Sequence, residues 1–192
     1  DAVAVRCFDL VTRRGTSGCL ALSALNDAGC VAACEGDLAS AVGMLWVREL
    51  LGTASWIANP SHADAVTGLL RLAHCTVARS LVTGWELRSH FESGLGVAIA
   101  GDLPPGPVTL LRLGGRRLDE LFLAEGQAVA IPRREDLCRT QVDVQLEPAA
   151  ITELLDRPLG NHLLLVPGRH APRLRGYWGW TVEDPNGFRR TA

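Results

Sequence analysis

The sequence predicts an α/β segment followed by mainly antiparallel β structure, that is, a partial parallel βαβαβ unit joined to a barrel-like antiparallel domain. Helix-like and strand-like apolar segments alternate up to about residue 65, which is typical of a parallel sheet. From there on, short apolar runs separated by turns leave no room for crossover helices. We therefore expect two domains: residues 1–65 as the C-terminal part of an α/β domain, and residues 66–192 as an antiparallel β-barrel-like C-terminal domain.

The first 65 residues supply the alternation of strands and helices. Gly29 and Gly52 each follow a segment with helical apolar spacing, and Pro60 follows an apolar run that is too short for a helix. The expected elements are a strand at 3–11, a helix at 19–28, a strand at 30–34, a helix at 38–51 and a strand at 54–58. Because helices join these strands, we expect the strands to pair in parallel.

The second part of the chain is expected to be antiparallel, as a barrel or a sandwich. One short helix is expected at 149–155, because Glu147 and Pro148 suit the start of a helix and Pro158 stops the chain beyond it. The expected strands are at 69–77, 86–91, 95–100, 108–113, 128–131, 140–146 and 162–166.

The composition excludes several classes of function. No apolar run reaches the length of about 18 residues that a membrane span needs. The 19 basic residues are all arginine and face 21 acidic residues, so a net charge of -2 gives no general attraction to nucleic acid. The absence of lysine excludes Schiff-base, pyridoxal phosphate and P-loop chemistry. No signal peptide is visible, so we expect a cytoplasmic protein whose six cysteines are mostly buried, reduced thiols.

Two polar residues stand at the carboxyl ends of predicted strands. Glu35 follows the strand at 30–34 and precedes a helix, and Asn59 holds the equivalent place after the strand at 54–58. Open α/β sheets bind ligands at such strand ends, so one crevice is expected to hold both side chains. The alternatives are that Glu35 and Asp37 only stabilise the helix N-terminus, and that Asn59 is a turn residue before Pro60.

His162 extends this set, because it begins a strongly apolar strand. Together with Glu35 and Asn59 it forms a mixed oxygen and nitrogen ligand set that suits Mn²⁺ or a similar divalent cation. Three further polar residues are expected either to support the ligands from behind or to lie in a hydrogen-bonded barrel interior: His74, His90 and Glu92.

The C-terminal segment interleaves arginines with aromatic residues: Arg169, Arg173, Arg175, Tyr177, Trp178 and Trp180. Such a pattern can bind single-stranded nucleic acid. In a chain without basic excess, contact with a sugar ring or with another subunit is the favoured interpretation.

Five separated motifs occur along residues 17–170: Cys34-Glu35-Gly36-Asp37-Leu38, Ala73-His74-Cys75-Thr76, His90-Phe91-Glu92-Ser93-Gly94, Cys138-Arg139-Thr140-Gln141 and Gly160-Asn161-His162. As a set and in this order, they resemble the C-terminal part of L-fucose isomerases. The resemblance implies that Mn²⁺ is bound by a glutamate, an aspartate and a histidine, and that the two carboxylates also transfer protons. These positions fall on Glu35, Asn59 and His162, so an amide replaces the aspartate. The resemblance also implies a homo-oligomer.

The function expected from the sequence is a metal-dependent aldose–ketose isomerase-like domain. It would act on an open-chain sugar of the L-fucose or L-arabinose type through an enediol, with Glu35 and Asn59 as catalytic residues. Glu35, Asn59 and His162 would hold the cation. Because Asn59 lacks the charge of aspartate, the alternative is a non-catalytic sugar-binding or regulatory module that keeps the fold.

Overall fold

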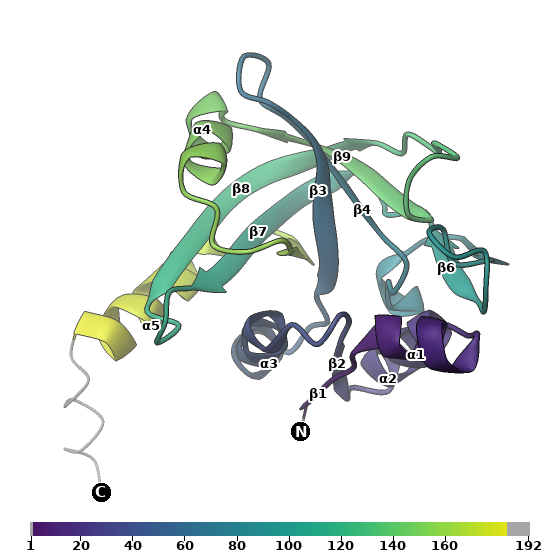
Figure 1. Cartoon of the computed structure of the whole chain (residues 1–192). Coiled ribbons are helices and arrows are strands. Elements are labelled where there is room, and N and C mark those ends of the chain that lie inside the picture. The colour runs from purple at the N-terminus through teal and green to yellow at the C-terminus, as the bar shows by residue number, and fades with distance from the viewer. Residues whose placement is uncertain (1, 184–192) are drawn as a thin grey trace, which may run out of the picture.

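The computed structural model of the chain describes residues 2–183 and is dominated by a closed six-stranded β-barrel (Figure 1). Every neighbouring pair of barrel strands is antiparallel. Around the barrel, the order is β10 (Leu163–Pro167), β3 (Trp56–Asp64), β4 (Leu69–His74), β9 (Thr140–Leu146), β8 (Glu120–Ala130) and β7 (Gly106–Gly114). The predicted barrel-like antiparallel part is therefore confirmed. Among residues 2–183, each helix is too short or too polar to cross a lipid bilayer.

A small α/β unit lies below the barrel in Figure 1. Its strands β1 (Ala2–Ala4) and β2 (Val31–Ala33) pair in parallel, as predicted. Helices α1 (Cys7–Arg14) and α2 (Cys19–Asp27) connect them, and α3 (Leu38–Leu51) follows β2.

The prediction that the third strand of the α/β unit pairs in parallel is wrong. Strand β3 pairs antiparallel with β4 and β10, because Trp56 and Ala58 complete the apolar barrel interior. The barrel sheet therefore begins at Trp56. The division into domains at residue 65 stays a prediction, and residues 184–192 of the second predicted domain lie outside the described residues.

The strand predicted at 3–11 is only partly correct, since β1 ends at Ala4 and α1 begins at Cys7. A short apolar run fits a strand and a helix equally well, and periodicity alone does not separate them. The strand predicted at 54–58 continues through Pro60 to Asp64. The register of β3 against β4 shifts between Pro60 and His62, and such a bulge tolerates a residue without an N–H donor.

Among the remaining predicted elements, α3 and β9 have the predicted ends, and the others are found with shifted ends. Besides the barrel strands, they are the hairpin of β5 (Trp85–Arg88) and β6 (Ala98–Gly101) and the helix α4 (Pro148–Asp156). Strand β8 is far longer than the predicted 128–131, because Glu125, Gly126 and Gln127 interrupt its apolar pattern. Helix α5 (Ala171–Glu183) was not predicted, since its two interior glycines disfavour a helix.

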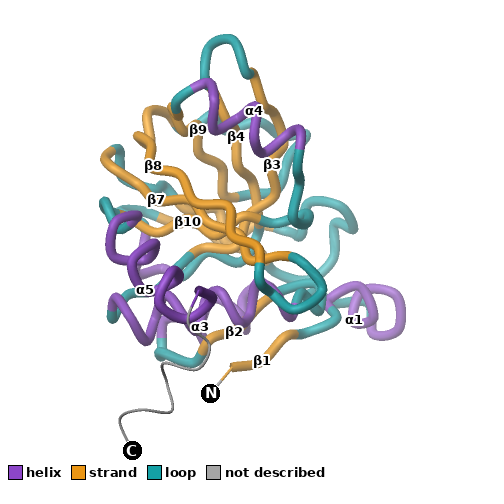
Figure 2. Tube along the Cα trace, turned by 90° about the vertical axis from the view of Figure 1, so that its left-hand side faces the viewer, coloured by secondary structure: helices purple, strands orange, loops and turns teal. Residues whose placement is uncertain are grey.

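Two apolar clusters position the site. One fills the barrel, and the other lies between its outer wall and α3 and includes Ile57, Leu111 and Leu164 of three barrel strands. Gly43 lets α3 approach closely, since a Cβ atom there would lie 2.8 Å from Leu164 Cδ1. Figure 2 shows α3 and α5 along this side of the barrel. This packing fixes α3 against the wall that carries β7 and β10.

The C-terminal aromatic residues pack onto the same region. The rings of Tyr177 and Trp178 on α5 lie 6.4 Å and 5.8 Å from the Trp46 ring on α3, measured between centroids. These rings therefore join α5 to α3, which gives part of the aromatic pattern a role in packing.

Candidate metal centre

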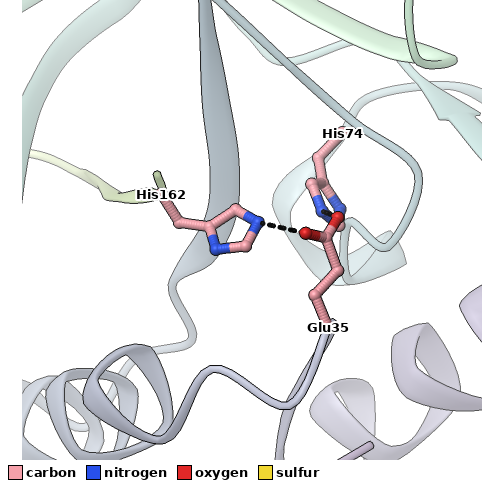
Figure 3. Close-up of side chains that lie close together, drawn as sticks. All are labelled: Glu35, His74 and His162. Carbon is pink, nitrogen blue, oxygen red and sulfur yellow. Dashed lines mark ion pairs between the residues drawn. The ribbon is translucent and has the colours of Figure 1, made fainter. Parts of the chain in front are cut away.

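Three side chains from distant parts of the chain converge between the barrel and the α/β unit (Figure 3). They are Glu35 from the turn after β2, His74 from the end of β4, and His162 from the residue before β10. Each offers one ligand atom, and these atoms all lie within 4.8 Å of one another. The two carboxylate oxygens of Glu35 face one ring each, with Oε1 3.5 Å from His74 Nε2 and Oε2 3.4 Å from His162 Nε2.

The position of Glu35 depends on an unusual turn. Glu35 has a φ of 57°, which is uncommon for a residue with a side chain, and Gly36 follows with a φ of 68°. The turn is held from the β1–α1 side, because the Gly36 N–H donates to the Val5 carbonyl and the Cys34 thiol contacts the Cys7 thiol at 2.7 Å. Backbone strain of this kind is concentrated at functional sites, and here it aims the carboxylate at both imidazoles.

His74 is the ligand that the sequence-based set lacked. By strand alternation it shares the inner face of the barrel with Leu70 and Leu72, and it ends β4 at the barrel mouth beside Glu35. Its Nδ1 atom lies 3.0 Å from Thr76 Oγ1, so the Nε2 atom is the one that faces the carboxylate. The His74 and His162 rings meet edge to face, with centroids 5.4 Å apart.

His162 is almost completely enclosed, with 2% of its side chain exposed. Its Nδ1 atom lies 2.9 Å from Asp37 Oδ2. Its Nε2 atom is buried and, among the described residues, has no hydrogen-bond partner, because the approach of Glu35 at 3.4 Å is only an ion-pair contact. A buried nitrogen without a partner normally carries a free-energy cost, and a metal ion would supply the missing interaction. The donor set of one carboxylate and two imidazoles therefore fits a divalent transition-metal ion.

The charges of the centre are strongly coupled. Contact with His162, and then with His74, holds the pKa of the Glu35 carboxyl well below its usual range despite partial burial. Burial lowers the pKa of His162, but the carboxylates of Asp37 and Glu35 outweigh burial and raise it to about 9. Without a cation, the centre therefore holds an imidazolium between two carboxylates at neutral pH.

Asp37 has the helix-capping role that the sequence left open as an alternative. Its Oδ1 atom accepts a hydrogen bond from the Ser40 N–H, so it caps the N-terminus of α3. Burial raises the pKa of its carboxyl, but hydrogen bonds from His162 and Arg112 lower it to a value well below the usual range. Asp37 is thus an ionised group that touches one of the three candidate ligands.

Asn59 lies on β3, between the strands that lead to the two histidines. It pairs with Ala73 of β4, and its neighbour Ala58 pairs with Leu163 of β10. By strand alternation Asn59 shares the outer face of the barrel with Ile57, which packs toward α3. Among the described contacts, none joins the Asn59 side chain to the three converging residues. Its roles as a metal ligand and catalytic residue stay predictions.

His90 and Glu92 border the centre without joining the three-residue group. The His90 Nε2 atom lies 3.7 Å from Glu92 Oε2, and its Nδ1 atom lies 3.0 Å from Ser93 Oγ. Both residues line one pocket with Glu35, His74 and the cysteines Cys7, Cys19, Cys34, Cys75 and Cys138. The sequence-based expectation that they surround the ligands is compatible with this position.

Comparison with known proteins relates the chain to sugar isomerases. No protein-family model matches it. It is 30% identical over 180 residues to the sulfoquinovose isomerase of Alkalicoccus urumqiensis, which covers 86% of this chain and 39% of that protein. The sulfoquinovose isomerase of Priestia megaterium (strain ATCC 12872 / QMB1551) is 30% identical over 181 residues, 88% of this chain and 40% of that protein. That of Clostridium sp. (strain MSTE9) is 31% identical over 159 residues, 78% of this chain and 35% of that protein.

The chain thus spans at most about two fifths of the length of the curated relatives it matches. Their names support the coarser part of the resemblance described above, a relationship to sugar isomerases. They name a sugar other than L-fucose.

Proposed function

We propose that the chain is the metal-binding part of a divalent-cation-dependent aldose–ketose isomerase that acts on an open-chain sugar. The observation that carries this proposal is the convergence of Glu35, His74 and His162 in a chain whose relatives are named as isomerases of a sugar. A carboxylate beside a cation site is what a proton transfer next to a carbonyl group requires.

Glu35, His74 and His162 would hold the cation. The buried Nε2 atom of His162, which has no hydrogen-bond partner among residues 2–183, supports this role. Mn²⁺ is our first choice of ion, because the resemblance to L-fucose isomerases implies it and because the carboxylate and amide oxygens of the proposed site suit it. Asn59 is proposed as an additional, neutral oxygen ligand from β3. When bound, a divalent cation would act as a Lewis acid toward the oxygens on the first two carbons of the sugar.

Glu35 is proposed to carry the proton. Its carboxyl is kept ionised, and 26% of its side chain is exposed, so a substrate can reach it. In the direction from aldose to ketose, the carboxylate would take the proton from the second carbon, which leaves an enediolate, and would then return it to the first carbon. The hydroxyl proton on the oxygen of the second carbon would move to the oxygen of the first carbon, so that the products balance.

The substrate class follows from the relatives. Since they are named for sulfoquinovose, a hexose that carries a sulfonate, we propose a sulfonated aldose as the first substrate to test, before L-fucose and L-arabinose. We also propose a homo-oligomer, which light scattering of the complete protein would detect.

The test is an isomerase assay of the complete protein with this panel of aldoses, with and without Mn²⁺. We expect ketose formation that depends on the cation and that Glu35→Gln lowers by at least about a hundredfold, the size expected for loss of a proton-transferring group. Glu153→Gln, the same substitution on an exposed part of α4, should leave the activity unchanged. Full activity of Glu35→Gln would contradict the assignment.

A non-catalytic sugar-binding module is the second candidate, and the amide at Asn59 favours it. An amide oxygen can bind a cation, but it does not supply a second proton-transferring carboxylate. This candidate predicts that calorimetry detects sugar binding in the presence of Mn²⁺ while no aldose is converted. Conversion of any aldose in the panel excludes it.

A further inference from the structure

The Asp37 carboxylate connects the start of α3 to the candidate metal centre. Its Oδ2 atom accepts hydrogen bonds from Arg112 Nη1 at 2.6 Å, from Ser40 Oγ at 2.9 Å and from His162 Nδ1 at 2.9 Å. Its Oδ1 atom accepts from the Ser40 N–H. One side chain therefore performs two tasks, since one oxygen caps the helix and the other faces the imidazole.

The arrangement around this carboxylate leaves little freedom. The Arg112 side chain on β7 is 8% exposed, and its Nη1 atom also donates to Ser40 Oγ at 2.6 Å. Gly160 is needed next to it, because a Cβ atom at Gly160 would collide with the Arg112 guanidinium. The contacts thus join the turn after β2, the C-terminal end of β7 and the segment that leads into His162.

We propose that Asp37 is a positioning residue that fixes the tautomer and the ring orientation of His162, so that the Nε2 atom faces Glu35 and His74. The proposal deepens the function proposed above and rests on it. Asp37 touches His162 and none of the reacting atoms, so its effect would pass through the imidazole.

The chemistry of the donors and acceptors supports this role. An ionised carboxylate only accepts hydrogen bonds, so the hydrogen between Asp37 and His162 must lie on Nδ1. The lone pair of a neutral ring is then on Nε2, the atom that points into the centre. Metal-binding histidines are commonly held in this way by a carboxylate, and loss of that partner typically weakens metal binding 10- to 100-fold.

Asp37→Asn replaces one acceptor oxygen of the carboxylate with an NH₂ donor and changes the shape of the side chain little. Asparagine is as good a helix cap as aspartate, so its oxygen can keep the bond from Ser40. The amide NH₂ then takes the place of Oδ2 and faces donors from Arg112, Ser40 and His162. The His162 ring can form a hydrogen bond with this amide only if its Nδ1 atom accepts. The ring hydrogen then lies on Nε2, which blocks that atom as a metal ligand.

The test uses the complete protein with Mn²⁺ and Co²⁺ as probes. Calorimetry with Mn²⁺ should show 10- to 100-fold weaker binding for Asp37→Asn. In the Co²⁺-loaded, unaltered protein, NMR should show a strongly shifted, solvent-exchangeable N–H signal from His162, which His162→Gln identifies by its loss. Asp37→Asn should lose this signal as well. Asp64→Asn is the matched control, since Asp64 accepts bonds from Val66 and Thr67 in the β3–β4 turn at the other end of β3.

Unchanged Mn²⁺ affinity and an unchanged N–H signal in folded Asp37→Asn would overturn the proposal. If the unpaired Arg112 prevents folding, the double variant Asp37→Asn with Arg112→Leu removes the buried charge and is judged by the same two measurements. Loss of affinity and signal in a protein that converts no sugar would support the role of Asp37 while the proposed isomerase activity fails. Absence of metal binding in the unaltered protein would overturn both.

Discussion

Raising the pH is expected to tighten the binding of a divalent cation to the candidate centre. The cation and a proton compete for the Nε2 atom of His162, because that atom can bind a metal only through its free lone pair. The pKa of His162 is raised to about 9 by Asp37 and Glu35 against the opposing effect of burial. Below that pH, each cation that binds must therefore displace a proton.

The size of the effect follows from this pKa. At pH 7, two units below a pKa of about 9, only about one molecule in a hundred has an unprotonated His162 ring. The apparent dissociation constant at pH 7 should therefore be about 100-fold weaker than its limit at high pH. It should fall about tenfold for each pH unit up to about pH 9, which corresponds to about 1.4 kcal/mol of binding free energy per unit.

Calorimetric titration with Mn²⁺ between about pH 6.5 and 8.5, in buffers that differ in ionisation enthalpy, measures both the affinity and the protons released. We expect close to one proton per cation from His162. His62→Gln, at an exposed position of β3, should behave like the unaltered protein, while His162→Gln should bind weakly and lose this proton. An affinity that stays constant over this range, with no proton released, would refute the reasoning.

Three further predictions concern affinity and stability. Asn59→Asp should tighten Mn²⁺ binding about tenfold or more by calorimetry, since it adds an anionic ligand, and an equal affinity would show that the side chain faces away from the cation. Gly160→Ala displaces Arg112, so it should lower the unfolding free energy by about 1–3 kcal/mol in urea titrations and also weaken Mn²⁺ binding. The control is Gly68→Ala, which has a φ of 77° in a distant turn and should lower stability without changing Mn²⁺ binding. Without metal, protonated His162 stabilises the fold by at most about 3 kcal/mol. This contribution is fully present below about pH 6.5 and should be lost as the pH rises through about 9. A midpoint of urea unfolding that stays constant over this range would contradict the prediction.

The local part of the fold could be predicted from the sequence, because glycine, proline and apolar period act over a few residues. Helix α3 starts and ends at the predicted residues, between the cap Asp37 and Gly52, whose φ of 69° ends the helix in the left-handed conformation. The partners of the strands could not be predicted in this way. Strand β3 was expected to pair in parallel, yet Trp56 and Ala58 are buried inside the barrel, which only the whole set of strands defines.

The candidate site could be predicted only in part, because local signals mark some of its residues while strand pairing decides which residues meet. Glu35 and His162 stand at element ends and could be found from the order of the motifs, and the structure brings them together. His74 was expected at most to support the ligands, because a histidine in a short apolar run has no local sign of its partner. Its signal was positional: it follows Leu70 and Leu72 with strand period and ends β4, where side chains leave the apolar barrel interior.

The amide at Asn59 changes the charge of the centre as well as its affinity for a cation. Asp37 is balanced by Arg112, and both imidazoles are neutral when they bind a metal, so Glu35 is the one uncompensated anion among these residues. A bound divalent cation would then leave one net positive charge, where an aspartate at position 59 would leave none. Isomerisation places negative charge on the sugar oxygens as the proton leaves carbon, and a positive site stabilises that charge more in the transition state than in the ground state. Weaker metal binding and retained catalysis are therefore compatible, and the same positive charge would favour a sugar that carries an anionic group.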